Sequence, residues 1–414
     1  MNRREPARRL RLVLAGGLLS FALIGLWYRT PLWRAAYPHL PRRLQALPYR
    51  WQAWWPGRPT PVSLPTLAIA STASPAAPFA RSTRDAPPPA PQASVTPGVT
   101  ATPATTPPAR ADITGVRHEY QTWNNCGPAT ISMALSVFGA GGDQASAAAV
   151  LKPDPDDKNV GPDELAAYAR RQGYGALVRV NGSTDRLKRL LAAGFPLIVE
   201  TWFVPEPGDE MGHYRVLTGY DEADGAFRAA DSYHGPRVRL PFGDFDRLWR
   251  VFNRTYVVVY PRHRDSEAMA LLGADRDDRA MYVAAAARAQ AEVGTEADAF
   301  GWFNLGSSLV GLGEAPAAAG AYDRARRLGL PWRMLWYQFG PLEAYAAVGR
   351  WDDVRALAVA NLANAPNLEE SHYWLGRARA AAGDAAGSRS SWERALALNP
   401  HMAAARSALD ALGR

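Results

Sequence analysis

A single cysteine constrains this chain more than any other residue. Cys126 is the only cysteine among 414 residues, and it lies in the stretch Gln121-Thr-Trp-Asn-Asn-Cys-Gly-Pro-Ala-Thr130. Apolar residues then recur through residues 131–138 at the spacing of a buried helix face. We therefore predict a helix that begins at or just after Cys126, with Pro128 in its first turn, where the missing N–H removes no hydrogen bond.

A thiol at the start of a helix has the surroundings of a nucleophile. Unpaired amide groups and the positive end of the helix dipole both stabilise the thiolate relative to the thiol. Gln121 lies five residues earlier and carries an amide that can donate a hydrogen bond to an oxyanion beside the sulfur. The alternative is a cysteine that is simply a small buried hydrophobic residue. The Gly-Pro that follows Cys126 favours the interpretation of this cysteine as a functional nucleophile.

A nucleophile of this kind needs a base and a group that orients the base. Alternation in residues 211–220 predicts a strand with His213 at its entry, and residues 225–232 read as the antiparallel return strand, with Asp231 near its end. Such a hairpin would place the imidazole and the carboxylate side by side. His234 is a competing candidate for the base, and His118 is a weaker third.

The stretches NNCGPAT, GHYRVLTGYD and AADS together resemble the double-glycine, bacteriocin-processing type of papain-like cysteine peptidase (family thirty-nine), in its stand-alone branch. The resemblance covers residues 113–262. It implies Cys126 as the nucleophile, His213 as the general base, Asp231 as the orienting group and Gln121 as the oxyanion donor. No transporter portion follows in the sequence, so the resemblance does not extend to a double-glycine leader peptide as the substrate.

The region around these motifs, residues 113–264, is expected to be an α+β domain. Helical and strand patterns are mixed along it, and the strands can pair antiparallel. The further expected helices cover residues 162–171 and 184–193, and the further expected strands cover residues 176–180, 196–203 and 255–260.

Residues 265–414 carry a different pattern, rich in alanine and without strand signals. The spacing of Trp302, Leu305-Gly306 and Tyr322 resembles the tetratricopeptide repeat, and Leu375-Gly376 with Trp392 repeats it. The resemblance implies an all-α domain of paired helices whose concave face holds a protein or peptide partner. A stack that only braces the peptidase domain is the alternative.

The N-terminal part of the chain reads as a membrane anchor followed by a stalk. Five arginines occur within residues 1–11, and residues 12–28 are free of charge. At about 1.5 Å per residue such a run is roughly as long as a hydrocarbon core is thick. We therefore predict a transmembrane signal anchor in residues 1–34, with the other domains extracytoplasmic at the cell membrane. Residues 35–112 are rich in proline, alanine and threonine, which predicts a disordered or extended juxtamembrane stalk.

Composition excludes several classes of function. One cysteine permits no intrachain disulfide and no thiolate cluster for a metal, and no cofactor motif is present, so we expect neither metal nor cofactor. The net charge of +8 comes without a basic stripe interleaved with aromatic residues, which argues against a nucleic-acid partner.

The sequence is best interpreted as a membrane-anchored cysteine peptidase that acts on a peptide or protein through Cys126, His213 and Asp231. Two rival interpretations remain open at this stage. One is a non-catalytic peptidase-like module that binds or presents peptides at the cell surface. The other is a different acyl transfer by the same thiol, such as amide or isopeptide chemistry on cell-wall material.

The anchor predicts how the full-length protein will fractionate. It should stay in the membrane fraction after washes with high salt and with carbonate, because about 17 consecutive uncharged residues are held by the hydrocarbon core rather than by surface charge. Immunoblotting of the washed membranes measures this, and release of the full-length chain by either wash would contradict the anchor.

Overall fold

The computed structural model describes residues 61–67 and 106–413, except for 155, 156, 158, 205–208, 296 and 297. The expected anchor in residues 1–34 and most of the expected stalk in residues 35–112 lie outside the described residues. Within the described part of the chain, no helix is both long and apolar enough to cross a membrane.

A seven-stranded antiparallel sheet forms the centre of the first domain. Its strands follow the order β2-β7-β3-β4-β5-β6, and β1 pairs with β4 beside this path. The strands are β1 (Arg110–Asp112), β2 (Tyr174–Arg179), β3 (Leu197–Phe203), β4 (Met211–Asp221), β5 (Ala226–Asp231), β6 (Gly235–Pro241) and β7 (Tyr256–Pro261).

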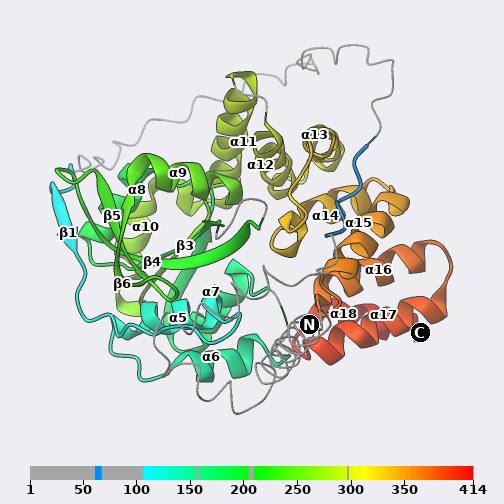
Figure 1. Ribbon diagram of the computed structural model, residues 1–414, viewed down its shortest axis with the longest axis horizontal. Coiled ribbons are helices and arrows are strands. Elements are labelled where there is room, and N and C mark those ends of the chain that lie inside the picture. Colours follow the sequence, from blue (N-terminus) through cyan, green and yellow to red (C-terminus); the bar gives the residue numbers. More distant parts are fainter. Residues whose placement is uncertain are drawn as a thin grey trace, which may run out of the picture.

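Helices cover both faces of this sheet (Figure 1). One layer consists of α5 (Cys126–Ser136), α6 (Gln144–Leu151) and α7 (Pro162–Arg171), and the other of α8 (Thr184–Ala192), α9 (Phe242–Trp249) and α10 (Asp265–Leu272). Alternate strand residues point to opposite layers. Ile198 belongs to the core beneath α5, whereas Leu197 and Val199 belong to the core beneath α8 and α10.

The α+β prediction is confirmed at the level of its elements. The expected helix at Cys126 is α5, and the expected strands that carry His213 and Asp231 are β4 and β5. The ends of the domain in the structure differ from the bounds expected from the sequence, residues 113–264. Strand β1 lies in the segment expected to be stalk, and α10 packs into the sheet's core although it follows residue 264.

The second domain, here called the helical domain, consists of α11 (Asp278–Thr295), α12 (Ala299–Gly311), α13 (Ala315–Leu328), α14 (Gly340–Ala347), α15 (Trp351–Asn364), α16 (Glu369–Ala381), α17 (Ala385–Leu398) and α18 (Ala403–Leu412). Glycines permit the close approach of neighbouring helices. A Cβ on Gly306 would lie 2.7 Å from the Tyr322 ring, and one on Gly376 would lie 2.4 Å from the Trp392 indole.

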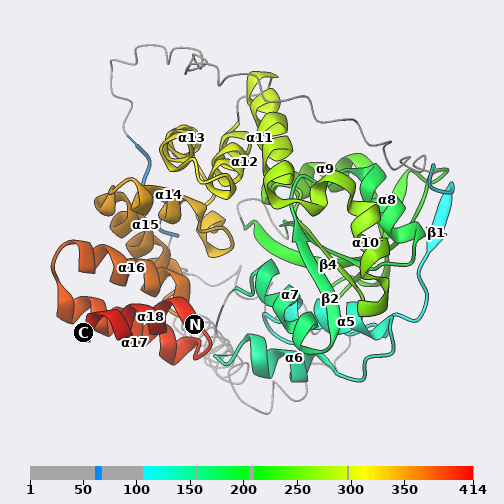
Figure 2. The same ribbon diagram turned by 180° about the vertical axis from the view of Figure 1, so that it is seen from behind.

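One buried hydrophobic cluster joins the two domains. Trp202 and Phe252 of the α/β domain belong to the same buried cluster as Phe303 and Tyr345 of the helical domain. Figures 1 and 2 show the helical domain as an arc along one side of the α/β domain. Polar contacts add to this interface: the side-chain amide of Asn304 donates to the Arg250 carbonyl at 2.7 Å.

Carboxylates are also buried where α16 meets the α/β domain. Asn159 donates to Glu370 at 3.0 Å, and Glu369, a neighbour of Glu370 in α16, is 3% exposed. Burial, together with the charge of Glu369, raises the pKa of Glu164 from 4.5 to about 7, although a hydrogen bond from the Gly161 N–H opposes the shift. The folded protein therefore favours a protonated Glu164.

This arrangement predicts a pH-dependent effect of Glu164→Gln on stability. Because the folded pKa lies above the ordinary value of 4.5, the carboxyl group destabilises the fold increasingly as the pH rises from 4.5 to about 7. Glutamine removes the charge and still accepts at this helix start. Thermal unfolding at pH 8 should shift upward by roughly 2–6 °C, with little shift at pH 4.5. The exposed Glu393→Gln is the matched control, and equal shifts at both pH values would contradict the assignment.

Candidate active site

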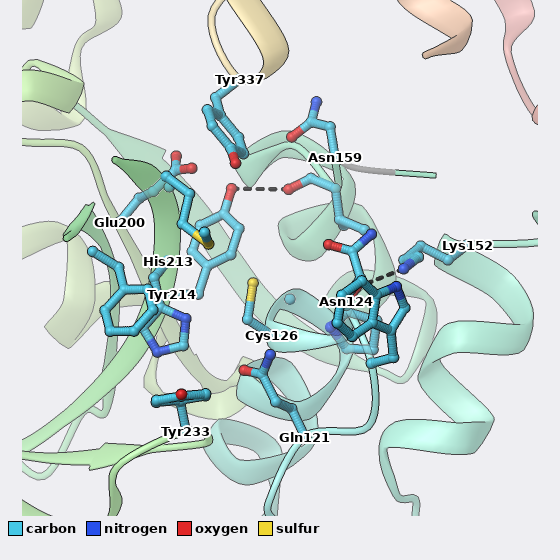
Figure 3. Close-up of a pocket in the computed structure, with 17 residues that line it drawn as sticks. Gln121, Asn124, Cys126, Lys152, Asn159, Glu200, His213, Tyr214, Tyr233 and Tyr337 are labelled. Atoms are coloured by element: carbon cyan, nitrogen blue, oxygen red, sulfur yellow. Dashed lines mark hydrogen bonds between the residues drawn. The ribbon is translucent and has the colours of Figure 1, made fainter. Parts of the chain in front are cut away.

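A pocket lies where α5, β3 and β4 meet the helical domain. The side chains that line it include Gln121, Cys126, Glu200, His213, Tyr214 and Tyr337 (Figure 3). No group of three or more His, Cys, Asp or Glu residues among the described residues has the arrangement of a metal site. The pocket contains the thiol of Cys126, the imidazole of His213 and the side-chain amide of Gln121.

The loop before Cys126 is held in place by one side chain of α6. The Gln144 amide oxygen accepts from the Thr122 N–H at 2.8 Å and from the Asn125 amide at 3.0 Å, while its nitrogen donates to the Tyr120 carbonyl at 2.8 Å. These bonds fix the backbone that leads into α5. Cys126 therefore occupies a defined position at the first residue of the helix.

Cys126 and His213 share a side-chain hydrogen bond, and each changes the pKa of the other. Burial alone would raise the pKa of the thiol, but the hydrogen bond and charge of His213 and the Tyr214 N–H lower it below 9.0. Burial alone would lower the pKa of His213, but Asp231 and Cys126 raise it to about 9. Both shifts therefore favour the ion pair of a thiolate and an imidazolium over the neutral pair.

Asp231 holds the far side of the imidazole. Strands β4 and β5 are antiparallel, so the start of one meets the end of the other, and His213 Nε2 lies 3.0 Å from Asp231 Oδ1. This leaves Nδ1 as the ring nitrogen for Cys126. Asp231 is fully buried, and its other oxygen accepts from Arg215 Nε at 2.7 Å. Burial opposes its ionisation, but these cations hold the pKa of Asp231 far below 3.8.

The two competing histidines lie beside this group but outside the pocket lining. His234 Nδ1 is 3.1 Å from Asp231 Oδ2, and its side chain is 43% exposed. His118 Nε2 is 2.9 Å from the Asp231 carbonyl oxygen. Of the three candidates, only His213 contacts both Cys126 and the carboxylate.

Gln121 is fixed from the side opposite Cys126. Its amide oxygen accepts from Ser232 Oγ at 2.7 Å, and its backbone N–H donates to the Ser232 carbonyl at 2.9 Å. The side-chain oxygen is therefore occupied, and the amide nitrogen is directed toward Cys126 (Figure 3). All four residues expected from the sequence lie together, although Asp231 is behind His213 rather than in the pocket lining.

Glu200 in β3 is one pocket residue that the sequence analysis missed. It is 3% exposed, and its Oε1 has no hydrogen-bond partner. Burial and the negative charge on Cys126 raise the pKa of Glu200 well above 4.5, despite a hydrogen bond with Tyr214. Burial thus favours the protonated form of this carboxyl group, which faces the pocket. Its signal was present: a glutamate interrupts the otherwise apolar run Leu197-Ile-Val-Glu-Thr-Trp-Phe203.

Tyr337 was also missed, and it belongs to the helical domain. It follows α13 in the chain and lines the same pocket as Cys126. Gly212 makes room for it: a Cβ there would lie 3.1 Å from the Tyr337 ring and 2.7 Å from Glu200 Oε1. No local pattern around Tyr337 could reveal this role, because the contact depends on how the two domains pack.

Comparison with known proteins gives a family match that covers this site. Residues 113–257 match the peptidase C39-like family. Among solved structures, the chain is similar to a protein described as a C39-like peptidase from Bacillus anthracis, at 17% identity over 36% of this chain and 96% of the other, with a TM-score of 0.31. The first tetratricopeptide repeat of Spaghetti (RPAP3), solved with an HSP90 peptide, aligns at 17% identity over 28% of this chain and 90% of the other, with a TM-score of 0.26. A search of curated proteins gives no match. The α/β domain is called the C39-like domain below.

The contacts of the C39-like domain predict which histidine activates the thiol. His213→Ala should slow alkylation of Cys126 by iodoacetamide at pH 6 by about tenfold or more, because the thiolate loses its charge partner. His234→Ala should stay within about twofold of the unsubstituted protein, since His234 contacts Asp231 but not Cys126. Mass spectrometry of timed samples gives both rates. The reverse ranking would move the base to His234.

Proposed function

We propose that the protein is a cysteine peptidase that hydrolyses peptide bonds in a peptide or protein substrate. The observation that carries the proposal is the pairing of Cys126 with His213, whose second nitrogen is held by the buried Asp231 carboxylate. Acyl transfer to water requires a nucleophile in contact with a base, and a group that orients the base. The match to the peptidase C39-like family supports the same chemistry.

The reaction follows from the positions of the side chains. The Cys126 thiolate adds to the peptide carbonyl carbon, and the oxyanion that forms accepts from the Gln121 amide and from the backbone N–H at the start of α5. Imidazolium His213 gives its proton to the leaving amine, so the C–N bond breaks and a thioester remains. Neutral His213 then takes a proton from water, which adds to the thioester and releases the acid and the thiolate.

The helical domain and the N-terminal segment complete the proposal. Tyr337 forms part of the pocket wall, so a substrate that reaches Cys126 contacts both domains. The helix pairs suit a tetratricopeptide assignment with a protein partner, and residues 1–34 suit a signal anchor that keeps both domains at the outer face of the cell membrane.

A peptide-library digestion tests the peptidase proposal. The unsubstituted protein should cleave a defined set of bonds, Cys126→Ala none, and Asp231→Asn should lose about two orders of magnitude or more in kcat/KM. His234→Ala is the matched control and should retain activity. Activity should fall as the pH rises through about 9, because His213 must be protonated to release the amine, and should also fall in acid as the thiolate is protonated.

Three results separate this proposal from its rivals. Slow alkylation of Cys126 in the unsubstituted protein, with no cleavage of any peptide, would contradict hydrolysis and favour a binding module. Products joined to an added amine in place of water would favour amide or isopeptide chemistry. Cleavage that persists in Cys126→Ala would exclude the thiol as the nucleophile.

A further inference from the structure

Residues 61–67 lie extended against the helical domain, far along the chain from the helices that they contact (Figure 1). The Val62 N–H donates to Asn364 Oδ1 at 2.8 Å, and Asn364 Nδ2 donates back to the Val62 carbonyl at 2.7 Å. One side chain at the end of α15 thus satisfies both main-chain groups of a single residue. This form of recognition is independent of the side chain at that position.

Leu64 supplies the apolar part of the contact. It is 4% exposed and belongs to the buried cluster that contains Leu357 and Ala360 of α15. Its neighbours are different: Val62 is 45% exposed, and Ser63 and Thr66 are exposed as well. The helical domain therefore encloses one side chain of this segment and leaves most of the others in solvent.

A buried arginine donates a hydrogen bond to the main chain of the residue after Leu64. Arg326 of α13 is 3% exposed, and its Nε donates to the Pro65 carbonyl at 3.0 Å. Its Nη1 is held by Asp353 at 2.6 Å, and Asp353 is itself bound by Arg350. This network orients the Arg326 N–H before a ligand arrives, which lowers the entropy that binding must overcome.

The surface of α13 and α15 that holds residues 61–67, here called the groove, consists of side chains that do not line the pocket around Cys126. Polar contacts to the C39-like domain come from α11, α12 and α16 and from residues 333–338, whereas residues 61–67 hydrogen-bond to α13 and α15. The side chains that hydrogen-bond to residues 61–67, Asn364 and Arg326, are therefore different from those that hydrogen-bond to the C39-like domain.

We propose that the groove between α13 and α15 is a peptide-binding site for extended, uncharged segments that carry leucine followed by proline. Residues 61–67 occupy it as a ligand supplied by the same chain. Proline at the position after leucine fits because only its carbonyl is used, and it favours an extended conformation in the residue before it. Covalent attachment gives this segment a high effective concentration, so a free peptide of the same kind binds only by displacing it.

Binding of a fluorescent, end-blocked peptide with the sequence of residues 61–67 to the full-length protein tests the proposal. Leu64→Asp in the protein places an unpaired carboxylate in the apolar site and expels the attached segment. The peptide should bind this variant about tenfold or more tighter than it binds the unsubstituted protein. Ser63→Asp adds the same charge at an exposed position and should leave peptide affinity unchanged.

A second substitution assigns the binding to the groove. Asn364→Ala, added to Leu64→Asp, should abolish peptide binding while the alkylation rate of Cys126 stays the same, which shows that the chain remains folded. A folded Leu64→Asp variant that does not bind the peptide would overturn the proposal. Equal affinity of the variant and the unsubstituted protein would overturn it too, because the attached segment would then not be the occupant. Binding that survives Asn364→Ala would place the peptide elsewhere.

Discussion

The site depends on one fully buried carboxylate. Asp231 carries a negative charge without solvent, which is tolerated only because cations and N–H groups surround it. Arg215 and His213 come from β4, and the Tyr233 N–H from the turn that follows β5. A shift in the register of these strands would leave the carboxylate unpaired. The same contacts that make the charge tolerable therefore also set the orientation of the imidazole.

The packing of the two domains has a comparable effect on the pocket. Trp202 near the end of β3 is buried against the helical domain, next to Tyr337, with ring centroids 6.3 Å apart. The same strand carries Glu200, and Tyr337 itself lines the pocket. Stability of the interface and the shape of the pocket are thus properties of the same few side chains, and a substitution at Trp202 would affect both.

Local periodicity in the sequence was enough to predict α5, β4 and β5, and with them that His213 and Asp231 lie side by side, whereas the resemblance to papain-like peptidases added Cys126 to this pair. The other features depend on packing between distant segments, which periodicity does not encode. Arg215 looked like an ordinary strand residue, although it is 6% exposed and pairs with Asp231. Tyr337 could not be placed without the domain interface. Residues 61–67 read as stalk because their composition is poor in large apolar residues, yet one leucine and a few main-chain groups are sufficient for docking.

The docking of residues 61–67 also determines the path of mechanical load through the molecule. A force applied to the chain before residue 61 reaches the end of α15 and the Arg326 network before it can reach β1. The two hydrogen bonds with Asn364, the hydrogen bond from Arg326 and the contacts of the buried Leu64 would have to break first. The helical domain therefore bears a force from the N-terminal side before the sheet does, and such a force reaches the pocket through the interface that carries Tyr337.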